Sequence, residues 1–221
     1  MEFQEFLTKQ EEVYQNFKNS EETVRKEGIK AHDSKGESAY FIAFRHLPEI
    51  AEKVEEFSLR IARELPSLTY MKEAVHTTIS DYNVRKDFTL NPDILRKLST
   101  AVYSIREELS RVSIDYTKWL YNQDTLIAAG MPNESFLRNS EIIRDAAVAE
   151  GLELRLPWGA HITTARFEES LSPDSLSDFY KLMQEAVPIG NSIPFAIDIG
   201  VGHITEEFEL NTYERFQLNK S

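Results

Sequence analysis

One short pattern occurs twice in this chain, and its spacing limits the possible folds more than any other feature. His76-Thr77-Thr78 and His161-Ile162-Thr163 each place a histidine two residues before a threonine. The apolar run Phe41-Ile42-Ala43-Phe44 is echoed by Leu126-Ile127-Ala128-Ala129, and the interval from Phe41 to Leu126 equals the interval from His76 to His161. The shared register indicates a duplicated structural unit, and we expect an approximate two-fold axis to relate the copies.

Each copy has the pattern of a strand, a helix and a second strand. In the first copy we predict a strand at residues 40–44, a helix from Pro48 to Pro66 and a strand at residues 73–80. In the second we predict a strand at residues 126–129, a helix that ends at Gly151 and a strand that begins near Ala160. The remaining predicted elements are a helix at 91–112, a strand at 114–120, a helix at 174–186, and strands at 195–201 and 203–210.

Residues 1–37 have a different character from the rest of the chain. Apolar residues spaced along one helical face predict an amphipathic helix from Glu2 to Lys26. Residues 27–38 carry glycine, aspartate and serine without an apolar period, which is typical of a linker. We therefore expect an N-terminal helix and linker over residues 1–37 and one domain over residues 38–221, a division that a length of 221 residues allows.

Composition excludes several classes of function. The chain has no cysteine, so thiol nucleophiles, disulfides and thiolate metal sites are excluded. Lysine and arginine number 25 against 37 acidic residues, and a net charge of −12 disfavours duplex DNA or other long nucleic acid as a partner. The sequence shows no secretory signal and no apolar run of roughly 18 residues, so we expect a cytoplasmic protein without a membrane partner. Its oligomeric state is left open.

The two histidine motifs suit phosphodiester chemistry. Residues two apart in a strand point to the same face, so an axis between the two strands would bring two imidazoles and two hydroxyls to one cleft. A neutral imidazole can take a proton while a protonated one gives a proton to the departing oxygen, and a pKa near 6.5 populates both forms. We therefore predict His76 and His161 as the acid–base pair and Thr78 and Thr163 as phosphate ligands, without a metal or other cofactor.

These motifs resemble those of the 2H phosphoesterase superfamily, which is named for two His-x-Thr/Ser-x motifs and includes 2′,3′-cyclic phosphodiesterases and the so-called 2′-5′ RNA ligases. The resemblance extends from about Ser38 to Leu218 and includes the opening run from Tyr40 to Pro48. It implies a bilobed α+β fold in which two antiparallel sheets form a central groove that holds the four motif residues. The N-terminal helix, the insert from Asn91 to Val112, and Thr164 in place of an aliphatic residue depart from the family pattern.

The predicted function is a metal-independent phosphodiesterase. We expect hydrolysis of a 2′,3′-cyclic phosphate or a related small cyclic nucleotide or oligonucleotide end, because an acidic protein can neutralise few phosphates. One alternative is a 2′,5′-oligonucleotide or cyclic-oligonucleotide signalling phosphodiesterase, which the same four groups would serve. Another is a nucleotide-binding module without catalysis. The near symmetry of the motifs leaves the acid and base roles unassigned.

Further residues are candidates for substrate contact. Trp158 and Tyr40 carry rings that could stack on a base. Arg45, Lys118 and Arg166 could contact a phosphate, although regular alternation would place Arg166 on the face opposite His161.

The other histidines have simpler interpretations. His203 has the same spacing to a threonine but lacks the preceding strand and helix, so we expect a structural role. His32 lies in the polar linker and His46 at the entry to a loop, and we expect both to be solvated.

Overall fold

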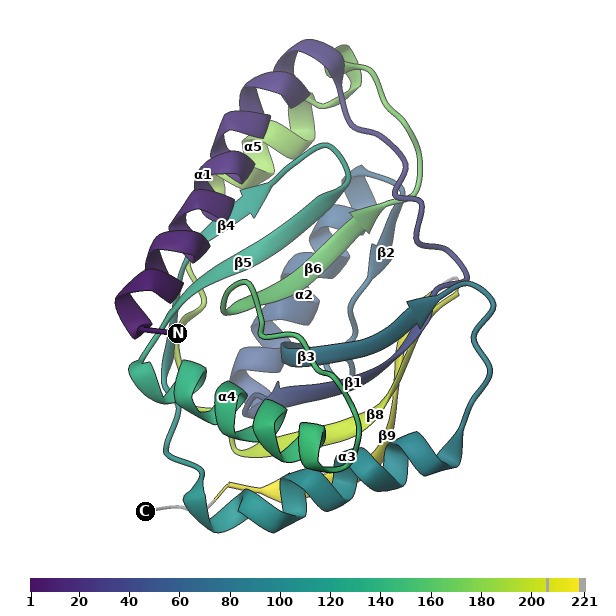
Figure 1. The fold of residues 1–221 in the computed structure, drawn as a ribbon. Helices are drawn as coiled ribbons and strands as arrows, with labels where there is room; N and C mark the ends of the chain where they lie inside the picture. Colours follow the sequence, from purple (N-terminus) through teal and green to yellow (C-terminus); the bar gives the residue numbers. More distant parts are fainter. Residues whose placement is uncertain (206, 219–221) are drawn as a thin grey trace.

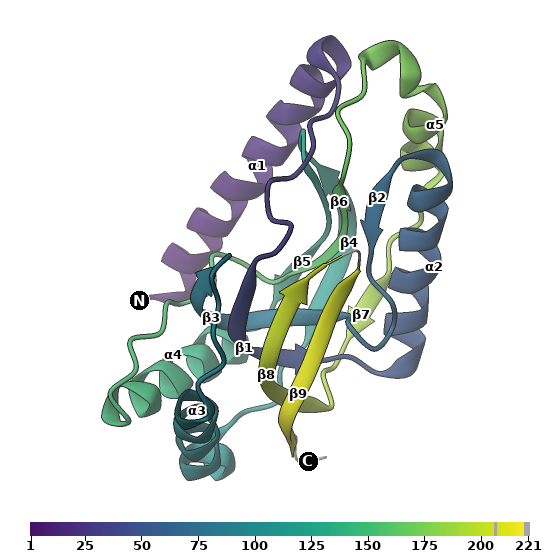
Figure 2. The same ribbon diagram turned by 90° about the vertical axis from the view of Figure 1, so that its right-hand side faces the viewer.

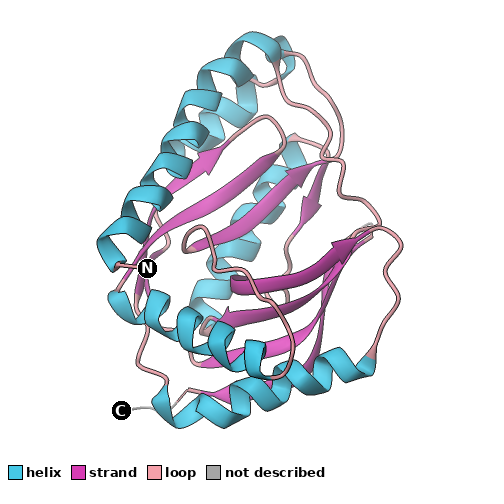
Figure 3. Cartoon of the chain, in the orientation of Figure 1, coloured by secondary structure: helices cyan, strands magenta, loops and turns pink. Residues whose placement is uncertain are grey.

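Two antiparallel β-sheets, with helices packed around them, form the described part of the chain (Figures 1 and 3). The computed structural model describes residues 1–205 and 207–218. The first sheet has the strand order β3-β1-β8-β9, and the second has the order β2-β6-β5-β4-β7. The predicted α+β fold with two antiparallel sheets and an N-terminal helix is confirmed.

The elements have the following bounds. The first sheet contains β1 (Ser38–Arg45), β3 (His76–Arg85), β8 (Ala196–Ile204) and β9 (Phe208–Gln217). The second contains β2 (Ser67–Thr69), β4 (Ile114–Tyr121), β5 (Thr125–Pro132), β6 (His161–Phe167) and β7 (Gly190–Ser192). The α-helices are α1 (Phe3–Glu27), α2 (Pro48–Glu64), α3 (Pro92–Ile105), α4 (Glu134–Ala149) and α5 (Ser177–Glu185).

The duplicated units are β1-α2-β3 and β5-α4-β6. Arg45 pairs with His76 in the first unit, and Ala129 pairs with His161 in the second. The interval from Arg45 to Ala129 is one residue shorter than the interval between the two histidines. The sequence predicted the same interval for both strands of the unit. That interval is correct for the strands that carry the histidines and one residue too long for the opening strands.

Local signals placed several boundaries correctly. Pro48 is the first residue of α2, and the Asn91 side chain caps α3 by accepting a hydrogen bond of 3.0 Å from the Asp93 N–H. Gly151 follows α4 with φ of 77°, the left-handed conformation that favours glycine after a helix.

Other boundaries were predicted wrongly. The strand break expected between residues 201 and 203 is absent, because β8 continues to Ile204 while paired with β1 on one side and β9 on the other. α3 ends at Ile105, earlier than expected, and β3 begins at His76 instead of residue 73. The short strands β2 and β7 were not predicted, since such brief segments show no period.

Each duplicated unit packs its helix against the sheet of the other unit (Figure 2). Phe57 and Ile61 of α2 share a buried cluster with Leu126 of β5 in the second sheet. Phe136 of α4 lies against Phe44 of β1, with ring centroids 5.8 Å apart, and Phe44 is fully buried. This exchange joins the two sheets into one body.

Helix α1 runs along the second sheet (Figure 1). Its residues Phe6, Tyr14 and Val24 are buried, and each belongs to one of the apolar clusters of the protein. None of the helices in the described ranges is both long enough and apolar enough to cross a membrane.

Candidate active site

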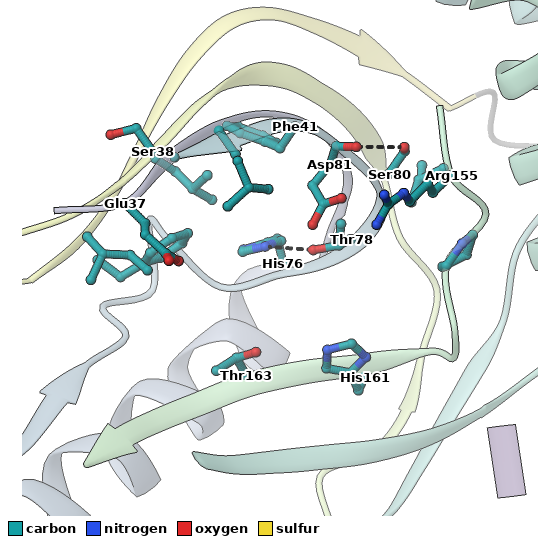
Figure 4. Close-up of a pocket in the computed structure, with 18 of the residues that line it drawn as sticks. Glu37, Ser38, Phe41, His76, Thr78, Ser80, Asp81, Arg155, His161 and Thr163 are labelled. Carbon is teal, nitrogen blue, oxygen red and sulfur yellow. Dashed lines mark hydrogen bonds between the residues drawn. The ribbon is translucent and has the colours of Figure 1, made fainter. Parts of the chain in front are cut away.

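The two histidine motifs lie on strands that face each other across the groove. β3 is an edge strand of the first sheet, and it contacts β6 of the second sheet. His76, Thr78, His161 and Thr163 all line one pocket of about 540 Å³ between these strands (Figure 4). The structure thus brings together the four residues that the motifs singled out.

Both imidazoles are held in the same orientation. His76 Nδ1 lies 2.7 Å from the Ala74 carbonyl oxygen, and His161 Nδ1 lies 3.3 Å from that of Gly159. Ala74 and Gly159 occupy equivalent positions in the two units, each two residues before its histidine. A carbonyl only accepts hydrogen bonds, so Nδ1 carries the proton in each neutral ring and Nε2 is left as an acceptor. The Thr78 hydroxyl donates to His76 Nε2 over 3.1 Å.

Burial changes the proton affinity of both rings. It lowers the pKa of His76 to about 4 and that of His161 to about 4, and the nearby positive charge of Arg166 acts in the same direction. Aromatic rings contribute to this burial, because Trp158 stacks on His161 at 4.0 Å between centroids and Phe208 stacks on His76 at 5.6 Å. The pKa near 6.5 assumed from the sequence is therefore too high, and both imidazoles are neutral at pH 7 in the free protein.

A β-bulge in β6 determines where Arg166 lies. Leu126 pairs with Ala165 and Ile127 with Thr163, so Thr164 is an extra residue that interrupts the alternation. Arg166 consequently lines the pocket with His161, and the prediction that placed it on the opposite face is wrong. The Ser58 hydroxyl of α2 donates to the Thr164 carbonyl over 2.7 Å and thereby holds the bulge.

β3 contains the equivalent bulge. Ile42 pairs with Ser80 and Ala43 with Thr78, which leaves Ile79 as the extra residue. Asp81 follows this bulge and also lines the pocket. Asp81 was not among the residues predicted to bind substrate, since a bulge leaves no local signal in a single sequence.

Two residues predicted to bind substrate differ in their surroundings. Trp158 lines the pocket and is 39% exposed, so the ring face turned away from His161 is available to a ligand. Tyr40 is fully buried against Phe88, and its hydroxyl accepts a hydrogen bond of 2.6 Å from the Asn91 N–H. Tyr40 therefore belongs to the core of the first sheet and is not available for stacking on a base.

The other cationic candidates lie outside the pocket. Arg45 is paired with buried Asp198, with 3.3 Å between Nε and Oδ2, and its Nη1 donates to the Val75 carbonyl over 3.0 Å. Lys118 is exposed and lines a separate hollow beside Lys18 of α1. Neither side chain is part of the histidine pocket.

The remaining histidines are not solvated as expected. His46 is 4% exposed, with Nδ1 2.7 Å from Ser192 Oγ and Nε2 3.0 Å from Thr77 Oγ1. Burial lowers the pKa of His46 to about 3. It lies between the sheets where β1 leads into α2, a tertiary setting that the loop residues do not reveal. His32 is half-buried, and its Nε2 accepts a hydrogen bond of 3.2 Å from Arg166.

His203 lies on β8 outside the pocket lining. Its Nδ1 is 2.7 Å from Ser38 Oγ. Within residues 1–205 and 207–218, no three histidine, aspartate or glutamate side chains are grouped so that they could hold a metal ion.

Comparison with known proteins identifies the fold. No protein-family model and no curated protein matches the sequence. Solved structures do match, among them E. coli LigT complexed with 3′-AMP, at a TM-score of 0.57, 14% identity and coverage of 83% of this chain and 99% of that chain. A structure described as a phosphoesterase matches with a TM-score of 0.54 at 13% identity and the same coverage. TT0787 of Thermus thermophilus matches with a TM-score of 0.52 at 17% identity, over 81% of this chain and 97% of that one.

The chain therefore has the same α+β fold as LigT and the structure described as a phosphoesterase. The fold expected from the motifs is confirmed, and both motifs lie on the strands that border the groove.

Proposed function

We propose that this protein hydrolyses a small nucleotide phosphodiester, with a 2′,3′-cyclic phosphate as the preferred substrate, by acid–base catalysis between His76 and His161. The observation that carries the proposal is the matched orientation of the two imidazoles. Each ring donates from Nδ1 to a carbonyl two residues earlier, which makes Nε2 the proton-transfer atom of each ring in a shared pocket; in the free protein Nε2 of His76 accepts from Thr78.

The reaction needs one histidine in each protonation state. The neutral Nε2 of one ring takes a proton from water as the water oxygen bonds to phosphorus. The bond from phosphorus to one ribose oxygen breaks, and the protonated Nε2 of the other ring gives its proton to that oxygen. The product is a nucleoside phosphate monoester. Because both free rings have a lowered pKa, the bound phosphate anion supplies the charge that favours the protonated form.

Three further side chains can stabilise the charge on phosphorus. Thr163 offers a hydroxyl donor, Thr78 offers another once its bond to His76 is exchanged for one to the phosphate, and Arg166 offers a fixed positive charge in the same pocket. Arg166 is anchored because its Nε donates to the Tyr70 hydroxyl over 3.0 Å and its Nη1 to Ser34 Oγ over 2.9 Å. A side chain fixed in this way loses little freedom when a phosphate binds.

Several observations support a small nucleotide as the ligand. A pocket of about 540 Å³ has the size of a small-molecule site, and Trp158 offers a ring face for a base. Among proteins of the same fold, LigT has been solved with 3′-AMP, with ATP and with NADP⁺. The net charge of −12 disfavours long nucleic acid.

A substrate panel tests the proposal. The protein is incubated with 2′,3′-cyclic and 3′,5′-cyclic mononucleotides and with 2′,5′- and 3′,5′-linked dinucleotides, and the products are resolved as 2′- or 3′-phosphates. Turnover confined to the 2′,3′-cyclic compounds supports the proposal, whereas turnover confined to the 2′,5′-linked ones favours an oligonucleotide phosphodiesterase. A nucleotide that raises the melting temperature but is recovered intact would identify a binding module instead.

A further inference from the structure

Helix α1 holds the residue that precedes His161 through two side chains. The Ala160 N–H donates to Gln10 Oε1 over 2.8 Å, and the Tyr14 hydroxyl donates to the Ala160 carbonyl over 2.8 Å. The Tyr14 oxygen in turn lies 3.1 Å from the Gly130 N–H of β5, from which it accepts. Both backbone polar groups of Ala160 are therefore bonded to side chains from the N-terminal helix.

These contacts are inside the protein, where geometry is most strongly constrained. Gln10 is 0% exposed and Tyr14 is 3% exposed. Breaking one of these bonds would leave a buried polar group without a partner, at a cost of roughly 1 to 3 kcal/mol, so each bond resists displacement. Gly159 makes the close approach possible, because a Cβ atom at that position would lie 2.9 Å from Gln10 Cγ.

An aromatic contact extends the connection to the imidazole itself. The Tyr14 ring meets Trp158 edge-on, with centroids 5.9 Å apart and planes at 86°. Trp158 then stacks on His161 with centroids 4.0 Å apart and planes at 19°. Residues 158–160 thus provide the ring that covers His161 and the carbonyl that accepts from its Nδ1, and α1 holds this segment in place.

The other histidine is held differently. The carbonyl before His76 belongs to Val75, which occupies the position in the first unit that Ala160 has in the second. It accepts a hydrogen bond from Arg45 of β1, a strand of the same sheet. The Ala160 carbonyl accepts from the Gly130 N–H of β5 over 2.8 Å and also from Tyr14, so α1 contributes to holding the residue before His161 but not the residue before His76.

We propose that Gln10 and Tyr14 are positioning residues for His161, so that α1 sets the orientation and proton affinity of one of the two histidines. The consequence for catalysis rests on the proposed phosphodiesterase function. The effect on the imidazole does not, because the protonation of His161 can be measured without any substrate.

The direct test is an NMR titration of the histidine rings in the full-length protein and in the variants Tyr14→Phe and Gln10→Ala. Both variants should free residues 158–160 and admit water to His161. Loss of burial raises the pKa of His161 and loss of the bond to Gly159 lowers it, and burial is the larger of the two effects. We expect the pKa of His161 to rise from about 4 by roughly half a unit or more, while that of His76 stays within about 0.2. An unchanged His161, or an equal shift of both rings, would overturn the proposal.

Two control variants on the same helix separate positioning from stability. Gln15→Ala removes an exposed side chain and should change neither the melting temperature nor the titration. Val24→Ala removes buried volume at the far end of α1, in a different apolar cluster from Tyr14, and should lower the melting temperature without moving the His161 pKa. If Val24→Ala shifted His161 as much as Tyr14→Phe does, the effect would be one of general loosening and the assignment would be wrong.

A kinetic measurement completes the test once a substrate is known. Tyr14→Phe should lower kcat about tenfold or more, because the proton-transfer geometry is disturbed, and the rise in KM should be smaller and arise only from the loosened Trp158 ring. If no nucleotide is cleaved but His161 still shifts, the phosphodiesterase proposal fails while the positioning role stands. If nucleotides are cleaved and the pKa of His161 does not shift, the positioning role fails while the phosphodiesterase proposal stands.

Discussion

Asp81 on β3 and Arg166 on β6 occupy equivalent positions in the duplicated units, each just after a β-bulge. They bring opposite charges to one pocket. Figure 4 shows the Asp81 carboxylate on the same side of the pocket as Thr78. The four motif residues are nearly symmetric, whereas these two equivalent positions carry opposite charges, and Glu37 and Arg155 add further charges to the pocket lining. Arg166 attracts phosphate oxygens and Asp81 repels them, and we expect this pair to favour one direction of entry for the substrate of the proposed reaction.

Exchanging either member of this pair should change activity in a different way. Arg166→Ala should lower kcat by about 10² to 10³, because a fixed charge on the phosphoryl group is lost. Asp81→Asn should leave kcat near normal but lower KM for nucleotides that carry an additional 5′-phosphate, since a repulsive charge is removed. Asp174→Asn, at an exposed position outside the pocket, is the matched control. Equal KM values for Asp81→Asn and the wild type with all substrates would contradict the polarity.

Removal of either motif histidine should abolish most turnover. His76→Ala and His161→Ala should each lower kcat by about 10² to 10⁴, the usual contribution of a positioned proton donor or acceptor. The melting temperature should change little, since both rings border the pocket. His203→Ala, with the same spacing to a threonine but outside the pocket, should keep near-normal rates. A comparable loss in His203→Ala would mean that the wrong pair of motifs has been chosen.

The pH dependence should reflect the lowered pKa of both rings. The profile of kcat/KM reports the free enzyme, so its maximum should lie below about pH 6.5 and fall as the pH rises through the pKa of the acid. The profile of kcat should be displaced to higher pH, because the bound phosphate anion raises the pKa of the imidazolium. Steady-state rates from acid to alkaline pH provide the measurement. A rate that rises steadily to about pH 10 would indicate attack by hydroxide and exclude the paired mechanism.

The stability of the fold should depend on pH through His46. In the unfolded chain its imidazole binds a proton near pH 6.5, whereas in the folded protein the pKa is about 3. The unfolded state binds more protons between these values, so the contribution of His46 to stability is complete above about pH 6.5 and falls as the pH decreases. One such group contributes at most about 1.4 kcal/mol per pH unit. Urea unfolding between about pH 7.5 and 5 should show a shallower slope of stability against pH for His46→Gln, and an unchanged slope would be inconsistent with a buried neutral ring.

Activity should persist after treatment with a chelator. Two histidines and two threonines form a poor site for a divalent ion, and the proposed proton transfers use only side chains of the chain itself. Rates measured before and after dialysis against EDTA should agree. Loss of activity that Mg²⁺, Mn²⁺ or Zn²⁺ restores would point to a metal-assisted reaction and to acidic residues near the pocket.

The sequence was a good guide wherever the signal was local. Pro48 marks the start of α2 and Gly151 the end of α4, because each residue has a restricted or special backbone conformation. The repeated His-x-Thr spacing located the facing strands, since the period of a strand places His76 and Thr78 on one face.

The errors came from contacts between distant parts of the chain. The bulge that turns Arg166 into the pocket depends on pairing with β5, and the burial of His46 depends on Ser192 and Thr77, 146 and 31 residues away. The lowered pKa of His161 depends on a tryptophan that the sequence suggested only as a platform for a base. None of these partners can be recognised from spacing along a single chain.

The exchange of helices between the two units also bears on how the chain reaches its native state during synthesis. A ribosome that has released residues only as far as Arg85 presents Phe57 and Ile61 of α2 without the strands that cover them. β1 similarly lacks one of its two neighbours until β8 emerges, after helices α1 to α5 and both strands of the second unit. Such distant pairings slow folding. We therefore expect the nascent protein to stay incompletely folded until β8 has been made, and to need protection from aggregation during that interval.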